Sequence, residues 1–476
     1  MYEAPRPRLD SPEIWFDVSQ MIVHFGRYGK PTGIERLTCS LLAEMRKRPD
    51  AGQTHLYRID PGSGRFHEVD WALLDLIAES ARADRGAGAP QPFSSGGAPG
   101  RLARRVYELL PYDLQPAMRQ LAIAGAAFAK ATFRILKGWA VGLRHGRAGS
   151  YGARLKALTL PESDPPPGST LVNLGATWNM TRHIGSLADL KRRIGIKYVV
   201  IIHDVISLAE PDFCPGYFLD IFRAWLVDNL KLADRVLAIS DYTRRELLAW
   251  CAKADIAAPA IDVIPLAHEA PAPLASLPPL PASLLGAPYA LFVSTIEPRK
   301  NHVLLLEVWK RLIAAHGASA PKLVFVGNKG WASGDLLDRL ASCHWLDGHI
   351  VWLAGAGDAL LQSLYRSCRF TIYPSLLEGW GLPVGESLAF GKPCIASNRS
   401  SIPEVGEEFA EYFDPTDLRE CYALVETYSF DDSYLKARER FISDKFRPRL
   451  WRDVAAEISA VLDSVQWWVQ SLRQTA

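Results

Sequence analysis

A short apolar run that leads through a glycine-rich turn into a helix constrains this 476-residue chain more than any other feature. Residues 370–373 have the composition of a buried strand, and Pro383 suits the first position of a helix, where a missing N–H costs nothing. Gly379 and Gly381 allow the backbone of the turn to approach a ligand closely. The first N–H groups of a helix lack internal partners and lie at the positive end of its dipole. We therefore predict a phosphate-binding turn in an α/β domain.

Two glutamates flank this turn. Glu378 lies in the turn, whereas Glu386 lies about one helical turn inside the helix that follows. Their carboxylates are expected to contact different parts of one ligand, and the vicinal hydroxyls of a ribose or hexose suit such acceptors. The alternative is an ordinary strand, turn and helix with two solvated glutamates. The order Glu-Gly-Trp-Gly-Leu-Pro favours the ligand site, in which the amides of Gly381 and Leu382 meet phosphate.

The stretch EGWGLPVGE, residues 378–386, resembles the E-x7-E motif of glycosyltransferase family four, which comprises retaining nucleotide-sugar enzymes of GT-B fold. Residues 389–405 (AFGKPCIASNRSSIPEV) and 411–415 (EYFDP) are also similar to that family, in which a later strand and a capped helix close the site. Ser401 and Glu404 have the spacing of a capping box. The resemblance implies two Rossmann-like domains that face each other across a cleft.

A second match lies in residues 292–302, FVSTIEPRKNH, where a predicted strand runs into a loop with the adjacent cations Arg299 and Lys300. Such a pair is usually part of a solvated loop, but both side chains can neutralise phosphate oxygens. In the family the lysine at this place binds the donor diphosphate, so the resemblance implies this role for Lys300. Many relatives carry another arginine a few residues earlier, where this chain has Ser294 and Thr295. Arg299 is the candidate for that role.

Short apolar runs alternate with helical stretches along the chain, which predicts doubly wound parallel sheets. In the first half the runs are residues 14–17, 55–59, 170–174, 198–202, 235–239 and 262–265, and in the second half 290–293, 323–326, 350–353, 370–373, 394–396 and 411–413. The length and the 48% hydrophobic content suffice for two cores. The expected divisions are an N-terminal, acceptor-side Rossmann-like domain at 1–268 with an insertion at about 80–157, a proline-rich linker at 269–288, a nucleotide-sugar-binding domain at 289–446, and a terminal helical segment at 447–476 that crosses back to the first domain.

The first half is expected to supply the opposite wall of the cleft. Gly33 lies in the loop 29–36, before an apolar-periodic helix, and the family has a glycine-bearing loop there that faces the donor phosphates. His203 ends the apolar run 199–202, at the carboxyl edge of the predicted sheet, where open α/β sheets bind ligands. A histidine there is more often structural, but this one coincides with the family's HD signature, whose histidine lines the transferred-sugar pocket. Asp204 is expected to orient a loop.

Charge, cysteines and the N-terminus limit the other function classes. A net charge of +2 without a basic aromatic stripe makes no case for nucleic acid. The seven cysteines are scattered and include no C-x-x-C pair, so neither a disulfide framework nor a zinc site is predicted. The first thirty residues lack an apolar signal core, which favours the cytoplasm. The family commonly works without a metal and the chain has no D-x-D motif, so no cofactor is expected beyond the nucleotide diphosphate sugar as donor substrate.

The resemblance implies transfer of a hexose or deoxyhexose with retention at the anomeric carbon. The EPRKN loop looks most like mannosyl- and rhamnosyltransferase relatives, so mannose is favoured, with a hydroxyl of a saccharide or polyprenyl-linked glycan as acceptor in cell-surface polysaccharide synthesis. His203, Glu378 and Lys300 are the candidate catalytic residues. The alternatives are a sugar-nucleotide epimerase or hydrolase, which would turn over donor without acceptor, and a non-catalytic membrane-associated scaffold. Asn328 and Trp331 are candidates for the base end of the site.

One amphipathic segment departs from the family pattern. At helical spacing, residues 116–144 carry basic side chains along one arc and Phe128, Trp139 and several leucines on the other, and no acid occurs between positions 114 and 160. A basic face opposite aromatic and aliphatic residues is typical of an interfacial helix on anionic lipid. Packing on the protein's own core is the alternative, and three glycines weaken a continuous helix. The first interpretation would place the enzyme peripherally on the inner face of the cytoplasmic membrane.

Charge reversal of Lys130, Arg134 and Lys137 tests the membrane interpretation. Each cation near an anionic surface contributes about 1 kcal/mol of attraction, so the triple variant should sediment less with anionic vesicles than the unaltered protein does. Vesicles of neutral lipid serve as the control. Equal sedimentation of the two proteins with anionic vesicles would remove the interpretation.

Overall fold

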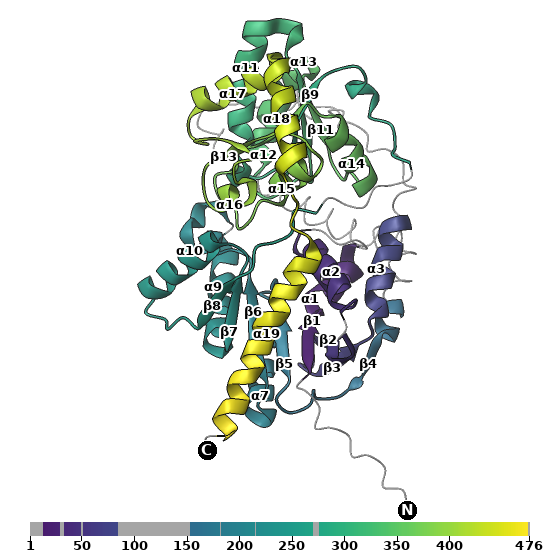
Figure 1. Cartoon of the computed structure of the whole chain (residues 1–476), viewed down its shortest axis with the longest axis vertical. Coiled ribbons are helices and arrows are strands. Elements are labelled where there is room, and N and C mark those ends of the chain that lie inside the picture. The colour runs from purple at the N-terminus through teal and green to yellow at the C-terminus, as the bar shows by residue number, and fades with distance from the viewer. Residues whose placement is uncertain are drawn as a thin grey trace, which may run out of the picture.

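The computed structural model describes residues 13–28, 33–48, 51–83, 153–180, 182–214, 216–269 and 276–474. The amphipathic segment at 116–144 lies outside the described residues, as does most of the insertion expected at about 80–157. Residues 270–275 of the expected linker also lie outside them. The described residues form two lobes, each built on its own sheet (Figure 1).

The first lobe is built on an eight-stranded sheet with the order β4-β3-β2-β1-β5-β6-β7-β8. Its strands are β1 (Ile14–Asp17), β2 (Thr54–Ile59), β3 (Phe66–Val69), β4 (Thr159–Glu162), β5 (Thr170–Asn173), β6 (Lys197–Ile202), β7 (Arg235–Ala238) and β8 (Ala260–Val263). Neighbouring strands are parallel along the series β2-β1-β5-β6-β7-β8, whereas β3 and β4 form an antiparallel edge. The central strands β1, β5 and β6 are almost fully buried.

The second lobe is built on a six-stranded, wholly parallel sheet with the order β11-β10-β9-β12-β13-β14. Its strands are β9 (Tyr289–Val293), β10 (Lys322–Val326), β11 (Ile350–Leu353), β12 (Phe370–Tyr373), β13 (Cys394–Ser397) and β14 (Glu411–Phe413). The order reverses direction between β9 and β12, whose carboxyl ends lie side by side. Open parallel sheets bind ligands at such a switch point.

Every apolar run that was predicted to be a strand forms one, with ends that differ by at most a few residues. Strands buried on both faces are continuous apolar runs in sequence, which makes them recognisable. The prediction missed β3 and β4. These strands lie at the edge, β3 is only buried at its ends, and β4 is mostly exposed, so neither has a continuous apolar pattern.

Helices cover both sheets (Figure 1). In the first lobe they are α1 (Ser19–Tyr28), α2 (Ile34–Met45), α3 (Ala72–Ala83), α7 (His183–Ile194), α8 (Ile206–Ala209), α9 (Gly216–Leu232) and α10 (Asp241–Lys253). In the second lobe they are α11 (His302–His316), α12 (Gly334–Ser342), α13 (His344–Gly348), α14 (Asp358–Ser367), α15 (Leu382–Ala389), α16 (Ile402–Gly406), α17 (Leu418–Phe430) and α18 (Asp432–Lys445). Ser240 caps α10, as expected, by accepting the N–H of Thr243.

The final helix, α19 (Trp451–Gln474), leaves the second lobe and runs along the first lobe (Figure 1). Its face with Val454, Ile458 and Leu462 is buried, and Ser459 Oγ lies 3.7 Å from Met45 Sδ of α2. The three apolar side chains and Met45 belong to a hydrophobic cluster that includes residues from both sheets. The chain therefore connects the lobes twice, between β8 and β9 and again through α19. In the described part of the chain, no helix combines the length and the apolar character needed to cross a bilayer.

The lobes also contact each other directly at the glycine turn. A Cβ atom on Gly379 would lie only 2.2 Å from the carbonyl oxygen of His203, so this close approach excludes any side chain at position 379. Beside it, the carboxylate of Glu404 accepts the backbone N–H groups of Asp241 and Tyr242, both at 2.8 Å. A carboxylate of the second lobe thus caps α10 of the first lobe.

The capping box expected for Ser401 and Glu404 is wrong. Ser401 precedes α16 but makes no side-chain capping bond there; its hydroxyl lies within hydrogen-bond distance of the carbonyls of Glu378 and Trp380, at 2.9 and 2.8 Å. Glu404 caps the other lobe instead. The spacing fits a capping box, but both side chains bind partners outside their own helix.

Glu404→Ala should shift the protein towards a more open arrangement of the lobes. The substitution removes two hydrogen bonds to a charged acceptor, each typically worth about 1.5–3 kcal/mol. Small-angle X-ray scattering should then record a larger radius of gyration than for the unaltered protein. Glu408→Ala removes the same charge from an exposed position nearby and should leave the scattering unchanged. Identical curves for the two variants would contradict a role for Glu404 in closure.

Candidate active site

The topology of the second lobe brings its cationic loop and its glutamate-containing glycine turn together. The loop after β9 contains Arg299 and Lys300, and the glycine turn follows β12; because β9 and β12 are adjacent parallel strands, their loops meet at one edge. The backbone N–H of Leu376 donates to the carbonyl of Arg299 at 2.8 Å. Asn301, at φ 59°, donates through its amide to the carbonyls of Pro374 and Pro415. These bonds hold the two loops together.

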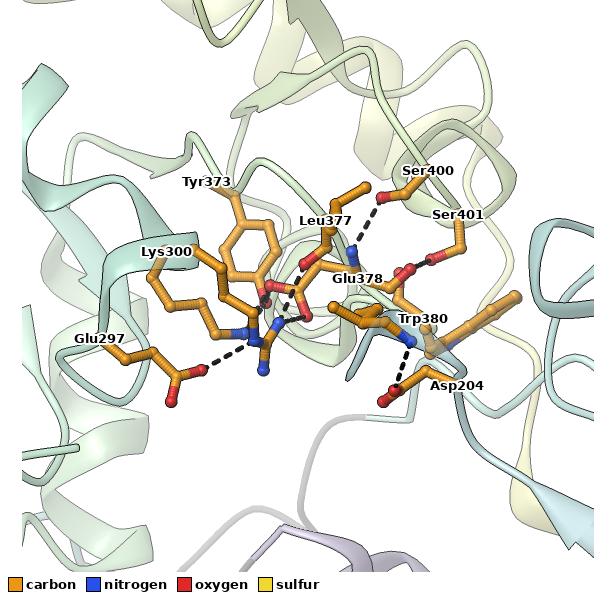
Figure 2. A network of polar contacts seen from close by, with 12 residues as sticks. Asp204, Glu297, Lys300, Tyr373, Leu377, Glu378, Trp380, Ser400 and Ser401 are labelled. Atoms are coloured by element: carbon orange, nitrogen blue, oxygen red, sulfur yellow. Dashed lines mark hydrogen bonds and ion pairs between the residues drawn. The ribbon is translucent and has the colours of Figure 1, made fainter. Parts of the chain in front are cut away.

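Glu378 lies at the centre of a buried charge cluster (Figure 2). Lys300 Nζ lies 2.5 Å from Glu378 Oε1, and the hydroxyl of Tyr373 donates to the same oxygen at 2.9 Å. Arg299 Nη1 donates to Glu378 Oε2 at 2.8 Å, and its Nε pairs with Glu297 at 2.9 Å. Lys300 is 7% exposed and Glu378 6% exposed. The structure thus brings Arg299, Lys300 and Glu378 into direct contact.

This cluster favours the charged forms of Glu378 and Arg299 but not that of Lys300. Burial by itself would raise the pKa of Glu378, but the adjacent Arg299 and Lys300 cations outweigh it and lower this pKa to about 2. Burial also opposes the charge of Arg299, yet the Glu378 and Glu297 carboxylates outweigh it and raise the pKa of the guanidinium. For Lys300, burial and then the neighbouring Arg299 cation lower the pKa, against the attraction of Glu378. The carboxylate therefore stays ionised across the physiological range.

The sequence analysis assigned Glu378 to sugar hydroxyls, and this role stays a prediction. A carboxylate has about four acceptor positions, and here Lys300, Tyr373 and Arg299 fill three of them. One position remains for a ligand hydroxyl. The ammonium of Lys300 likewise contacts Glu378 and, at 3.3 Å, the hydroxyl of Tyr373, which leaves one of its three N–H donors for a phosphate oxygen.

The glycine turn begins α15 as expected. Gly381 precedes the helix at φ 121°, in a region that L side chains rarely adopt, and Pro383 lies in the first turn. The amides of Gly381 and Leu382 lie at the start of this eight-residue helix, next to the Glu378 cluster in sequence. Phosphate binding by these amides is untested and stays a prediction.

Glu386 lies further along α15, where a side chain of the same lobe contacts it. The hydroxyl of Tyr365 in α14 donates to Glu386 Oε2 at 2.9 Å. From the first lobe, Arg36 Nη1 lies 3.8 Å from Asp358 Oδ1. Burial alone would lower the pKa of Arg36, but the Glu386 and Asp358 carboxylates outweigh it and raise the pKa. The carboxylate of Glu386 is therefore oriented by Tyr365, and it interacts electrostatically with Arg36 of the opposite lobe. Its role in donor binding stays a prediction.

Gly33 lies at the start of α2, three positions before Arg36 in the sequence, with φ 51°. Residues 29–32 of its loop lie outside the described part of the chain. Ile34, the next residue, lines the cleft between the lobes. A contact of Gly33 with donor phosphates stays a prediction.

His203 lies just after β6, at the carboxyl edge of the first sheet and against the glycine turn of the second lobe. Its Nε2 lies 2.8 Å from the carbonyl of Leu174. A carbonyl accepts only, so we assign the proton to Nε2, which makes Nδ1 an acceptor. Burial lowers the pKa of His203 and favours the neutral ring. At Gly175 a Cβ would lie 2.7 Å from the ring, so a glycine is needed there.

A cleft of about 490 Å³ lies between the lobes next to this cluster. Of the residues singled out in the sequence, His203, Arg299 and Trp331 line it, together with Glu297 from the second lobe and several first-lobe residues. Lys300 and Glu378 are buried beside Arg299. The described residues therefore combine the charge cluster around Glu378, the start of α15 and a cavity between the lobes.

Several contributors to this site were missed by the sequence analysis. Tyr373 is the last residue of a buried strand, Tyr365 lies on a helix, and Arg36 is the last residue of the expected glycine loop. None of the three was assigned a role from the sequence, because each acquires its partner through the tertiary fold. Glu297 lies within the recognised 292–302 segment, where a carboxylate two residues before Arg299 was the one available signal.

Comparison with known proteins gives a family match for the second lobe. Residues 282–444 match the family model described as "Glycosyl transferases group 1". The O-antigen chain mannosyltransferase B of Escherichia coli is 31% identical over 241 residues, which cover 50% of this chain and 62% of that protein. The serotype-specific mannosyltransferase WbdA of Escherichia coli is 26% identical over 254 residues, which cover 51% of this chain and 31% of that protein. The chain thus spans less than two thirds of the length of these relatives.

Among solved structures, HepE of Anabaena in complex with UDP-glucose aligns with a TM-score of 0.54 and 14% sequence identity. The alignment covers 95% of this chain and 100% of that chain. The fold is GT-B, with two Rossmann-like lobes, as expected from the sequence. The second lobe is therefore similar to group 1 glycosyltransferases, and the two relatives are mannosyltransferases by name.

Replacement of Glu378 by glutamine should destabilise the protein in a pH-dependent way. The folded pKa of about 2 lies below the ordinary value of 4.5, so the carboxylate contributes its full stability above about pH 4.5 and loses it as the pH falls towards 2. The gap in unfolding free energy between the two proteins should be on the order of 3 kcal/mol near neutral pH and narrow by about 1 kcal/mol near pH 3.5.

Thermal unfolding of both proteins across this pH range provides the measurement, with the exposed Glu408→Gln as a charge-matched control. A gap in melting temperature that does not change with pH would show that ionisation of Glu378 is not what stabilises the cluster.

Proposed function

We propose that this protein is a retaining glycosyltransferase that moves a hexose or deoxyhexose, with mannose favoured, from a nucleotide diphosphate sugar to a hydroxyl of a saccharide or polyprenyl-linked glycan. The observation that carries the proposal is the meeting of Arg299 and Lys300 with Glu378, at the turn that begins α15 and beside the interlobe cleft. Two cations and a helix start provide a binding site for a leaving diphosphate.

The reaction follows from these groups. The bond between the anomeric carbon and the diphosphate oxygen breaks, and the departing negative charge is stabilised by Lys300, Arg299 and the amides at Gly381 and Leu382. The acceptor oxygen bonds to the anomeric carbon on the same face, and a diphosphate oxygen takes its proton. The cations offset the leaving-group charge without a metal ion, so we propose none.

The remaining residues orient the donor. Glu378 keeps one acceptor position for a sugar hydroxyl, and Glu386, held by Tyr365, accepts from the ribose hydroxyls. The neutral His203 lines the cleft with an acceptor nitrogen for the transferred sugar. Closure of the lobes excludes water and protects the donor from hydrolysis.

Mannose and a cell-surface glycan are favoured because two relatives that match half of this chain carry the names mannosyltransferase B of the O-antigen chain and serotype-specific mannosyltransferase. Such a role suits an enzyme in the cytoplasm that associates peripherally with the inner face of the membrane, with no nucleic acid as partner. We propose this location and this lack of a nucleic-acid partner together with the activity.

The donor is identified first by thermal shift with GDP-mannose, GDP-fucose, UDP-glucose and dTDP-rhamnose. A ligand that binds the folded protein alone raises its melting temperature, and GDP-mannose is expected to give the largest rise. Release of free sugar at the same rate with and without glycan acceptors would favour a hydrolase or epimerase. The absence of a shift with every nucleotide sugar would contradict the proposal.

Two substitutions separate binding from turnover. Glu386→Ala should weaken donor binding about tenfold, because it removes hydrogen bonds from ribose to a charged group. Lys300→Ala should lower kcat by about 10²–10³, because it removes charge stabilisation of the leaving group. Lys310→Ala removes an ammonium group from the exposed face of α11 and controls for net charge. Transfer rates equal to those of the unaltered protein in both site variants would show that the site is wrongly assigned.

A further inference from the structure

The interlobe cleft has a wall of aromatic side chains for which the donor site has no use. Trp178 follows β5, Phe213 precedes α9, and the others lie along the first ten residues of α9 in the first lobe. The aromatic wall consists of Trp178, Phe213, Tyr217, Phe218, Phe222 and Trp225. Each of these rings lines the same cleft as His203 and Arg299.

The inner rings hold the outer ones in place. Trp178 makes edge contacts with Phe218, Phe222 and Trp225 at centroid distances of 5.7, 5.9 and 5.7 Å. Phe222 and Trp225 are buried, and Trp225 Nε1 donates to Thr177 Oγ1 at 2.9 Å. The wall therefore has a rigid base that the fold itself explains.

The outer rings are not explained by the fold. Tyr217 is 76% exposed, and Trp178 and Phe218 are only half-buried. Aromatic surface in contact with water at the edge of a cavity costs free energy that a ligand with an apolar face would recover. The cavity volume of about 490 Å³ falls within the range of about 300–1,000 Å³ that is typical of small-molecule sites.

Polar side chains also line the cleft, next to apolar ones such as Ile34 and Trp331. Asp204 uses one carboxylate oxygen to accept the N–H of Ile206, and Glu297 uses one to pair with Arg299, so each carboxylate has a second oxygen available for a hydroxyl group. An isoprenoid chain in this space would desolvate both carboxylates without giving them hydrogen-bond partners. A pyranose ring has an apolar C–H face and a rim of hydroxyls, which suits a cleft lined by both aromatic rings and carboxylates.

We propose that the aromatic wall is the binding site for a pyranose ring of the acceptor, whose C–H face stacks on Trp178, Tyr217 and Phe218 while its hydroxyls face Asp204 and Glu297. This inference rests on the proposed function, because it assigns the second substrate of the same reaction. His203 and Arg299 line the same cleft, so a hydroxyl of a ring bound there shares the cavity with the proposed transfer site.

The test measures binding of simple sugars to the full chain in the presence of GDP. Methyl α-pyranosides of mannose, glucose, galactose and rhamnose serve as probes in saturation-transfer-difference NMR. At least one should bind, with the strongest saturation on the C–H protons of one ring face. Tyr217→Ala should weaken its affinity about fivefold to tenfold, which corresponds to the loss of one ring contact. Tyr217→Phe should retain binding, because the ring and not the hydroxyl makes the contact.

Tyr217 is exposed, so its replacement leaves the core intact. Leu285→Ala removes an exposed apolar side chain that does not line the cleft, and it should leave binding unchanged. The affinity for GDP, measured by calorimetry, should be the same in all these proteins. Farnesyl phosphate, a probe for lipid chains, should not displace the pyranoside.

Four results would overturn the inference. The first is that no pyranoside binds the unaltered protein, and the second is that the one that binds has the same affinity for Tyr217→Ala. The third is a loss of GDP affinity in Tyr217→Ala, which would assign the wall to the nucleotide base. The fourth is displacement of the pyranoside by farnesyl phosphate. Failure of every nucleotide sugar to raise the melting temperature would instead contradict the proposed function and would leave pyranoside binding as a separate result.

Discussion

The ion cluster around Glu378 is the interaction on which the rest of the site depends. Arg299 and Lys300 are neighbours in the chain and largely buried, and two such cations would repel each other if no carboxylate lay between them. Glu378 accepts from both, and it reaches them because β9 and β12 are adjacent parallel strands. The loop after one strand and the glycine turn after the other therefore stabilise each other. A cationic site that is already organised before substrate arrives needs little rearrangement when negative charge develops.

The fold makes this cluster part of an interlobe site. Glu404 of the second lobe caps α10 of the first lobe, and α19 returns along the first lobe to share its hydrophobic cluster. These contacts describe lobes in a closed arrangement. Substrates of the size of a nucleotide sugar enter and leave such clefts by relative motion of the lobes, which is the usual behaviour of enzymes that exclude water. The aromatic wall lies on the lobe opposite the cations, so closure would bring two differently built halves around one reaction centre.

The sequence predicted the fold well where burial made patterns simple. Strands such as β9 and β12 are covered on both faces and are continuous apolar runs, and the glycine turn carries its own motif. The edge strands β3 and β4 lack such a pattern and were missed. Side-chain partners were harder to predict, because they depend on distant parts of the chain: Tyr365 with Glu386, or Glu404 with α10. Ser401 and Glu404 show the limit clearly, since a correct local spacing was overridden by tertiary contacts. The roles assigned to Gly33, Gly381 and Leu382 depend on a ligand and stay predictions.

The contact of Gly379 with His203 has a consequence for how reproducibly the cleft closes. At that point the lobes meet through a glycine and a carbonyl oxygen, both of which are main-chain groups. Main-chain positions do not vary with side-chain rotamers, so the contact acts as a fixed mechanical stop. Substitutions of neighbouring surface residues would leave the separation of the lobes at this point unchanged. Even a methyl group at position 379 would increase that separation.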